Sequence, residues 1–155
     1  MQLSKNSNKV QAYLNSFGLN INVLELNEST RTAQEAALAA DCEIGQIVKS
    51  LVFRSGEEAL MFLVSGKNQL DVKKVKDFLG KEISKADADF VKLKTGYVIG
   101  GVPPVAFSSP IEIFIDEDLL NYEFVWAAAG TPHAIFQIKS NDLPRLTGGK
   151  VIAVC

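Results

Sequence analysis

Two apolar runs near the middle of the chain constrain its fold more than any other feature. They are IVKSLVF, residues 47–53, and ALMFLVS, residues 59–65, and the polar stretch SGEE lies in the turn between them. Runs rich in Val, Ile, Leu and Phe that do not alternate with polar residues are typical of strands covered on both faces. We therefore expect a β-hairpin in a sheet that other elements cover from both sides.

Lys49 is the one charged residue in the first run. With the two-residue period of a strand, Lys49 shares a face with Ile47, Leu51 and Phe53. Lysine is almost never fully buried without a partner, and burying a bare ammonium group is energetically costly. Two interpretations are therefore open. The aliphatic part of the Lys49 side chain packs in the core and its ammonium group reaches the surface, or the ammonium group lies in a cleft and belongs to a functional site.

The remaining segments predict an α+β domain with a mixed or antiparallel sheet. Thr32 and Glu35 form the sequence signature of a capping box in front of an alanine-rich helix that ends near Asp41. Strands outnumber crossover helices, which does not suit a doubly wound parallel sheet. Further helices are expected in 5–17, 69–80 and 86–96, a short helix or turn in 140–149, and further strands in 21–26, 111–116, 124–130, 134–139 and 150–154.

Bulk properties narrow the class of protein. A chain of 155 residues suits one domain spanning 1–155, and no apolar run approaches the ~20 residues of a membrane span. The N-terminal stretch does not resemble a secretory signal, and two distant cysteines, Cys42 and Cys155, suit a reducing cytoplasm. The single histidine, His133, has no Cys or His cluster near it, so we expect neither a metal nor a cofactor.

The charge distribution leaves two interpretations open. The net charge of −2 argues against a protein that coats nucleic acid, and we expect no DNA partner. Residues 67–94 nevertheless hold eight basic and five acidic residues, a local net charge of +3. A solvated helical face is the preferred interpretation, and a modest surface that faces phosphates is the alternative.

Two loop sequences could contribute to a site together with Lys49. In GGVPP, residues 100–104, the adjacent glycines allow a ligand close to the backbone, whose N–H groups could bind an oxyanion. In AAAGTPH, residues 127–133, small side chains leave space and Gly130 permits a sharp turn. Each loop could equally be a tight turn or close packing. No nucleophile elbow or phosphate-binding glycine motif is present, so we expect chemistry without a protein nucleophile.

The three motifs, in order and spacing, resemble the YbaK/prolyl-tRNA-synthetase-associated domains, which hydrolyse mischarged aminoacyl-tRNA. The resemblance implies a compact domain with a mixed, barrel-like sheet flanked by helices. It also implies that Lys49 is the active-site lysine and that Gly100 and Pro104 end a GxxxP loop. Gly130 would lie in the small-residue loop, with His133 beside the aminoacyl group. The candidate substrate-binding residues are therefore Ser50, Gly100, Gly101, Pro104, Gly130 and His133, with Lys49 as the candidate catalytic residue.

The function implied by this resemblance is trans-editing by a cytoplasmic aminoacyl-tRNA deacylase. Its substrate would be the acceptor end of a tRNA mischarged with a small amino acid such as Ala, Ser, Thr or Cys. An aminoacyl-tRNA synthetase is a possible second partner, and no membrane is involved. Two alternatives remain: a non-catalytic module that binds aminoacyl-tRNA or a nucleotide, and a thiol-dependent transferase using Cys42. A structural role is the commoner one for such a cysteine.

Overall fold

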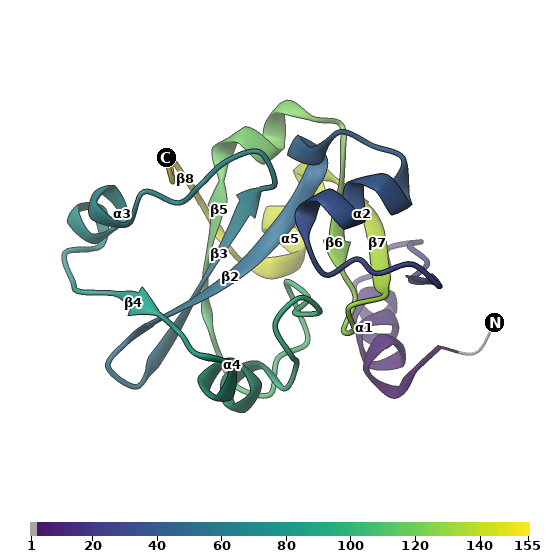
Figure 1. The fold of residues 1–155 in the computed structure, drawn as a ribbon, viewed down its shortest axis with the longest axis horizontal. Coiled ribbons are helices and arrows are strands. Elements are labelled where there is room, and N and C mark those ends of the chain that lie inside the picture. The colour runs from purple at the N-terminus through teal and green to yellow at the C-terminus, as the bar shows by residue number, and fades with distance from the viewer. Residues whose placement is uncertain (1–2) are drawn as a thin grey trace.

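The expected hairpin forms the centre of a mixed sheet (Figure 1). The computed structural model describes residues 3–155, in which β2 and β3 pair antiparallel and the strand order is β1-β7-β6-β2-β3-β5-β8, with β4 beside β2. The strands are β1 (Leu24–Glu25), β2 (Ile47–Ser55), β3 (Glu58–Ser65), β4 (Ser84–Lys85), β5 (Glu112–Asp116), β6 (Phe124–Ala128), β7 (Ala134–Lys139) and β8 (Lys150–Ile152). The helices are α1 (Lys5–Ser16), α2 (Ala33–Ala40), α3 (Val72–Leu79), α4 (Ala88–Thr95) and α5 (Leu143–Thr147), with short 3₁₀ helices η1 (Ile44–Gln46), η2 (Glu117–Asn121) and η3 (Ser140–Asp142).

The mixed architecture confirms the expected fold class, but the sheet does not close. Its path ends at β1 and β8, and within residues 3–155 no pairing joins these two strands. The barrel-like closure implied by the resemblance is therefore absent, and the sheet has two edges. No helix in the described part of the chain is both long and apolar enough to cross a membrane.

Helices cover both faces of the sheet, as the apolar runs predicted. Val48 and Val52 of β2 belong to the largest core cluster, to which α1, α4 and α5 also contribute buried side chains. On the opposite face, Ile47 packs with α2 and Phe53 packs with α3. Figure 1 shows α2 in front of one end of β2 and α3 well apart from it. Leu51, on the same face, also packs against the cluster of Phe53 and α3. Lys49 therefore lies between the two clusters and belongs to neither of them.

Local signals set most helix boundaries correctly. The Thr32–Glu35 capping box is present, and Asp41 ends α2 in the left-handed conformation. The strand expected over 21–26 is shorter, because the Gln11 side chain accepts from Val23 N and donates to Ile21 O. These bonds satisfy backbone groups that a longer strand would have used. The two-residue β4 and the 3₁₀ helix η2 were not predicted.

A gap in the sheet follows from the lengths of the strands beside β2. On one edge, β6 pairs with β2 only at Ile47 and Val48, and β4 pairs with it only at Phe53 and Arg54. Gly66 N donates to Ile47 O, so the backbone groups of Ile47 face β3. Along an antiparallel strand the backbone N–H and C=O groups of successive residues face opposite sides, so Lys49 and Leu51 also face β3. The backbone N–H and C=O of Ser50 consequently face the gap.

Candidate functional site

Two adjoining cavities of about 330 Å³ each lie at the gap in the sheet. The first cavity is bounded by α2, β2, β6 and the segment before α2, and the second by β2, β4, α4 and the turn after β3. They share one wall, formed by Lys49, Ser50, Leu51, Ile99, Gly100 and Val102. The residue that the sequence singled out therefore lies where the two cavities meet.

The Lys49 side chain is half-buried and its ammonium group has a fixed partner. Nζ donates a hydrogen bond to the backbone carbonyl oxygen of Asn68, in the turn that follows β3. Burial lowers the pKa of the Lys49 ammonium group, and the nearby Asp116 carboxylate opposes this shift. Lys49 is thus not free in solvent, and it forms no ion pair with any residue of 3–155. Of the two interpretations that the sequence left open, these surroundings favour a cation held in a cleft.

A buried carboxylate holds the turn that carries this partner. Asp116, at the end of β5, is only 1% exposed and accepts from Ser65 N at 3.0 Å and from Asn68 Nδ2 at 2.9 Å. The same Asn68 amide group donates to Asp118 Oδ2 at 2.8 Å. Two segments distant in sequence, the end of β3 with its turn and the end of β5 with the start of η2, therefore fix the carbonyl that binds Lys49. Neither Asn68 nor Asp116 was singled out from the sequence, because both look like ordinary turn and strand-end residues.

Two hydroxyl groups in the first cavity lack partners. Thr30 Oγ1 and Ser50 Oγ are buried and have no hydrogen-bond partner among residues 3–155. Both residues line the first cavity, and Thr30 is only 4% exposed. Buried polar groups are normally satisfied, so these two hydroxyls are candidate contacts for a polar ligand group. Ser50 was expected at the site, whereas nothing in the sequence distinguished Thr30 from the capping residues beside it.

The wall formed by α2 and β6 consists mainly of small side chains. Ala33 and Ala36 come from α2, and Ala127 and Ala128 from β6. Arg31 lies at the same cavity and packs over the loop, since a Cβ atom added to Gly100 would lie 2.5 Å from Arg31 Cγ. The alanines of β6 were anticipated as space-making residues, but the contribution of α2 and Arg31 was not.

The two glycine loops are joined to each other behind the cavity. Gly130 N donates to Gly101 O at 3.0 Å, and Gly100 and Gly130 have positive φ angles of 92° and 100°. A Cβ atom on Gly101 would lie 2.7 Å from the backbone carbon of Thr131. Gly101 is therefore needed for contact between the loops, and its expected role beside a ligand stays a prediction.

Four predicted site residues line neither cavity, and Gly101 is the first of them. Pro104 is buried and borders a different cavity beside Tyr13 of α1. Gly130 is buried against Asn6 of the same helix. His133 is exposed, and its Nδ1 lies 3.0 Å from Glu28 O. The structure thus brings together Lys49, Ser50 and Gly100, and leaves the proposed roles of the other residues as predictions.

Cys42 has the surroundings of a structural cysteine. Its side chain packs against the small cluster formed by α2 and Ile47. Burial raises the pKa of the Cys42 thiol, and the neighbouring carboxylates of Asp41 and Glu43 act in the same direction. The thiolate is the nucleophilic form of cysteine, so this environment disfavours the thiol-dependent transferase.

Some known proteins are similar to this chain over nearly their whole length, and others are similar only in one segment of a longer protein. YwhH of Bacillus subtilis, described as uncharacterized, is 26% identical over 148 residues, which is 94% of each chain. A proline–tRNA ligase of Thermosipho melanesiensis is 33% identical over 92 residues, covering 59% of this chain but only 16% of the ligase. The chain therefore corresponds to a small part of that enzyme.

Two solved structures and a family model are also similar to this chain over most of its length. A crystal structure described as that of a candidate trans-editing enzyme for prolyl-tRNA synthetase is 47% identical, with a TM-score of 0.93 over 99% of this chain and 98% of that one. The hypothetical protein APE2540 is 31% identical, with a TM-score of 0.87 over 94% of this chain and 98% of that one. The model of the aminoacyl-tRNA editing domain matches residues 27–146. Because this match includes both cavities' shared wall and far more than half of the sequence, the chain belongs to the aminoacyl-tRNA editing domain family.

Proposed function

We propose that this protein is a trans-editing aminoacyl-tRNA deacylase, which hydrolyses the ester between a small amino acid and the terminal ribose of a mischarged tRNA. The observation that carries the proposal is the half-buried ammonium group of Lys49, fixed on the Asn68 carbonyl at a cavity with unpartnered hydroxyls. Membership of the editing family and the similarity to a candidate trans-editing enzyme support the same activity.

In the proposed reaction the protein positions and polarises the substrate. Water attacks the ester carbonyl carbon, the bond from that carbon to the ribose oxygen breaks, and the ribose oxygen takes up a proton. The vicinal ribose hydroxyl lies close enough in the substrate itself to assist this transfer. Negative charge develops on the carbonyl oxygen, and the half-buried ammonium group of Lys49 stabilises it.

The unpartnered hydroxyls support a small or hydroxyl-bearing amino acid. A large apolar side chain in the first cavity would leave Thr30 Oγ1 and Ser50 Oγ buried without partners, at a cost of about 1–3 kcal/mol for each group. Serine, threonine or the α-amino group of alanine could hydrogen-bond to them instead. Discrimination among small side chains should stay modest, because one methylene group changes binding by only ~1–3 kcal/mol.

The direct test is the deacylation rate of tRNAs charged with Ala, Ser, Thr, Cys and Leu. We expect hydrolysis of the small amino acids, little of Leu, and loss of activity in Lys49→Ala. Lys73→Ala is the matched control, since Lys73 is an exposed lysine of α3 that forms no ion pair within residues 3–155. Binding of these tRNAs without hydrolysis of any of them would contradict the proposal and favour the non-catalytic binding module.

A further inference from the structure

Two lysines from different helices lie close to Gly96, the residue that caps the end of α4. Lys92 Nζ donates to Gly96 O at 3.2 Å, and a Cβ atom added to Gly96 would lie 3.7 Å from Lys9 Nζ of α1. Both lysines are exposed, and neither forms an ion pair within residues 3–155. Two positive charges therefore lie near one glycine, and no carboxylate in the described part of the chain is paired with either of them.

The helix that supplies Lys9 carries positive charge only. From its first residue, Lys5, to Ser16, α1 holds the two lysines Lys5 and Lys9 and no acidic residue. Residues four positions apart share a face of a helix, and like charges on that face repel each other. Lys5 also lies at the N-terminus of α1, where the helix dipole disfavours a cation. The lysines of α1 thus oppose the stability of their own helix, which points to a role outside it.

The segment after α4 leads from this pair of lysines to the site. Three residues separate Gly96 from Gly100, and Ile99 and Gly100 belong to the wall that both cavities share. Four steps of extended chain span ~14 Å at most. Val98 and Ile99 are 47% and 46% exposed, so the outer surface of the segment is open to a ligand. Figure 1 shows α1 and α4 at the same end of the molecule. A long ligand that leaves the cavities along this segment would therefore reach both lysines.

The substrate of the proposed reaction is a ligand of this kind. A tRNA continues beyond its esterified nucleotide as a strand with one negative phosphate for each nucleotide, and stacked nucleotides follow one another every ~3.4 Å. The distance of ~14 Å therefore corresponds to about four nucleotides. The protein carries a net charge of −2, so contact with a polyanion needs a local surface of unpaired cations.

We infer that Lys5, Lys9 and Lys92 form a surface that binds phosphates of the RNA strand preceding the esterified nucleotide; this inference rests on the proposed function. The three exposed ammonium groups attract the strand and direct it along the segment between Gly96 and Gly100. They do not discriminate between bases, because phosphate contacts carry no sequence information. The surface therefore contributes affinity for tRNA in general, and the selection of the amino acid stays with the first cavity.

The experiment measures the affinity of the intact protein for mixed uncharged tRNA over a series of salt concentrations. In Lys9→Gln/Lys92→Gln we expect the affinity to fall about ten-fold at low salt. The slope of log affinity against log salt should become shallower by about 1.4, which is ~0.7 for each lost phosphate contact to a single strand. A variant with the wild-type slope would overturn the inference.

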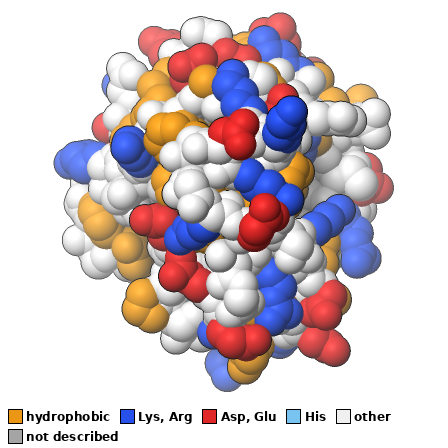
Figure 2. All heavy atoms as spheres, turned by 90° about the vertical axis from the view of Figure 1, so that its left-hand side faces the viewer, with side chains coloured by type: hydrophobic (Ala, Val, Ile, Leu, Met, Phe, Trp, Pro, Cys, Tyr) orange, Lys and Arg blue, Asp and Glu red, His pale blue; other side chains and the backbone are white. Residues whose placement is uncertain are grey.

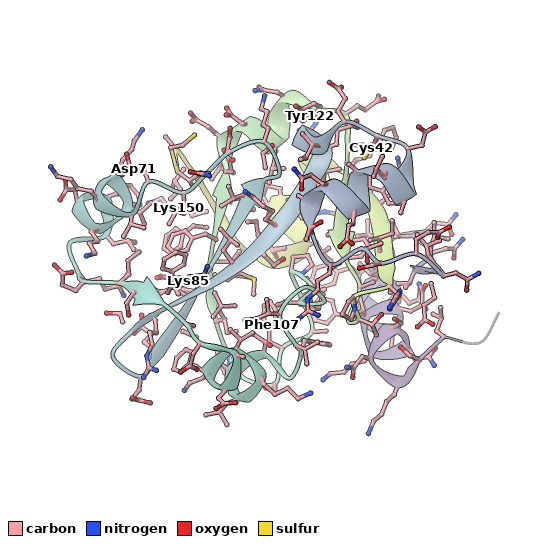
Figure 3. All side chains as sticks on the ribbon, in the orientation of Figure 1. Cys42, Asp71, Lys85, Phe107, Tyr122 and Lys150 are labelled. Atoms are coloured by element: carbon pink, nitrogen blue, oxygen red, sulfur yellow. The ribbon has the colours of Figure 1, made fainter. Side chains whose placement is uncertain are left out.

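Lys139→Gln/Lys150→Gln is the control with the same change in net charge. Both lysines are exposed and form no ion pair within residues 3–155. Figure 3 labels Lys150 on the far side of the molecule from α1. The control should keep the wild-type slope. A decrease as large as that of Lys9→Gln/Lys92→Gln would overturn the inference, because net charge and not a local surface would then explain the effect.

Two further measurements separate phosphate binding from a structural role. Lys9 Nζ lies 5.0 Å from the centroid of the Tyr97 ring, so Lys9→Arg keeps both the charge and the ring contact and should keep the wild-type slope. Lys9→Gln/Lys92→Gln should lower kcat/KM about ten-fold on aminoacyl-tRNA and leave it unchanged on aminoacyl-adenosine, which has no preceding phosphates. An equal decrease on both substrates would overturn the inference, because the lysines would then act on the site itself.

The failure of this inference is distinguishable from failure of the proposed function, because binding of uncharged tRNA requires no hydrolysis. If wild type deacylates mischarged tRNA but Lys9→Gln/Lys92→Gln keeps the wild-type slope, the deacylase stands and the phosphate-binding surface is wrong. If the slope becomes shallower but no charged tRNA is hydrolysed, the surface stands and the protein is a tRNA-binding module.

Discussion

Lys49 and the lysines of α3 lie on the same face of the sheet but have opposite surroundings. Lys49 is half-buried, bonds to a backbone carbonyl and has a lowered pKa. On α3, Lys73 is exposed, Lys74 donates to Cys155 O at 2.7 Å, and Lys76 pairs with Glu82. Figure 2 shows acidic and basic side chains intermingled on the side of the molecule that carries α3. The count of lysines in 67–94 thus gave less information about function than one lysine in an apolar run.

The physical difference is the dielectric surroundings of each charge. An exposed ion pair contributes about 0–1 kcal/mol, because water and salt screen it. A charge removed from water interacts far more strongly with any charge that develops beside it. The variants below test this comparison, and the largest effect is expected at Lys49.

Lys49→Ala should lower the deacylation rate by about 10²–10³-fold, the usual effect of removing one donor to a transition-state oxyanion. Lys49→Arg should stay slow, because the planar guanidinium group is wider than the ammonium group it replaces. Lys73→Ala should remain within about threefold of wild type, less than ~0.7 kcal/mol of barrier. Initial rates at equal folded fraction measure all three. An Ala variant at position 49 within threefold of wild type would return Lys49 to a structural role.

Stability provides an independent check on the same residue. Folding lowers the pKa of Lys49, so the charged form is disfavoured in the folded state. This penalty is complete at pH values below the folded pKa and is lost as the pH rises through the ordinary lysine value. At pH 7, Lys49→Met should therefore unfold at the same denaturant concentration as wild type or at a higher one. A clear loss of stability would show that the ammonium group is needed for the fold.

Asn68→Ala should lower the deacylation rate about ten-fold. The substitution removes the hydrogen bond from Asn68 to the Asp116 carboxylate and so loosens the turn whose carbonyl binds Lys49. The decisive measurement is the same substitution in the Lys49→Ala background. If Asn68 acts through Lys49, the ten-fold effect disappears there. An equal decrease in both backgrounds would mean that Asn68 supports the structure generally.

Charge reversal of Lys73, Lys74 and Lys76 to Glu should raise the KM for tRNA by about three- to ten-fold at low salt, as expected for exposed charges near a polyanion. The rate on a minimal aminoacyl-adenosine ester should stay unchanged, since that substrate does not extend to α3. Kinetics on both substrates at two salt concentrations measure the difference. A parallel change on tRNA and on the ester would place the tRNA surface elsewhere.

His133→Ala should have the smallest effect. The side chain is exposed, has one contact to Glu28 O and lines neither cavity. We expect rates within about twofold of wild type on every charged tRNA, less than ~0.5 kcal/mol of barrier, because the side chain does not reach either cavity. A changed preference between Ala and Ser would show that His133 moves to the amino acid when the tRNA binds.

The sequence by itself determined the elements and most of their boundaries. Apolar runs identified β2 and β3, and the capping residues Thr32, Asp41 and Gly96 placed the ends of α2 and α4. It also identified Lys49, since one charge in an apolar run is locally anomalous. These features depend on residues within a few positions of each other, so a linear pattern is sufficient to reveal them.

Only the tertiary structure decided which side chains meet at the site. The gap beside Ser50 exists because β6 ends its pairing at Val48 and β4 begins at Phe53, and neither length is visible in β2 itself. Asp116 accepts a hydrogen bond from Asn68 across 48 positions of sequence. Thr30 Oγ1 is buried without a hydrogen-bond partner among residues 3–155, which its local sequence does not indicate. His133 follows the expected loop, yet its side chain turns to Glu28. These contacts depend on the packing of segments that are distant in sequence. A hydrophobic pattern predicts that a residue is buried, but it does not predict which element buries it.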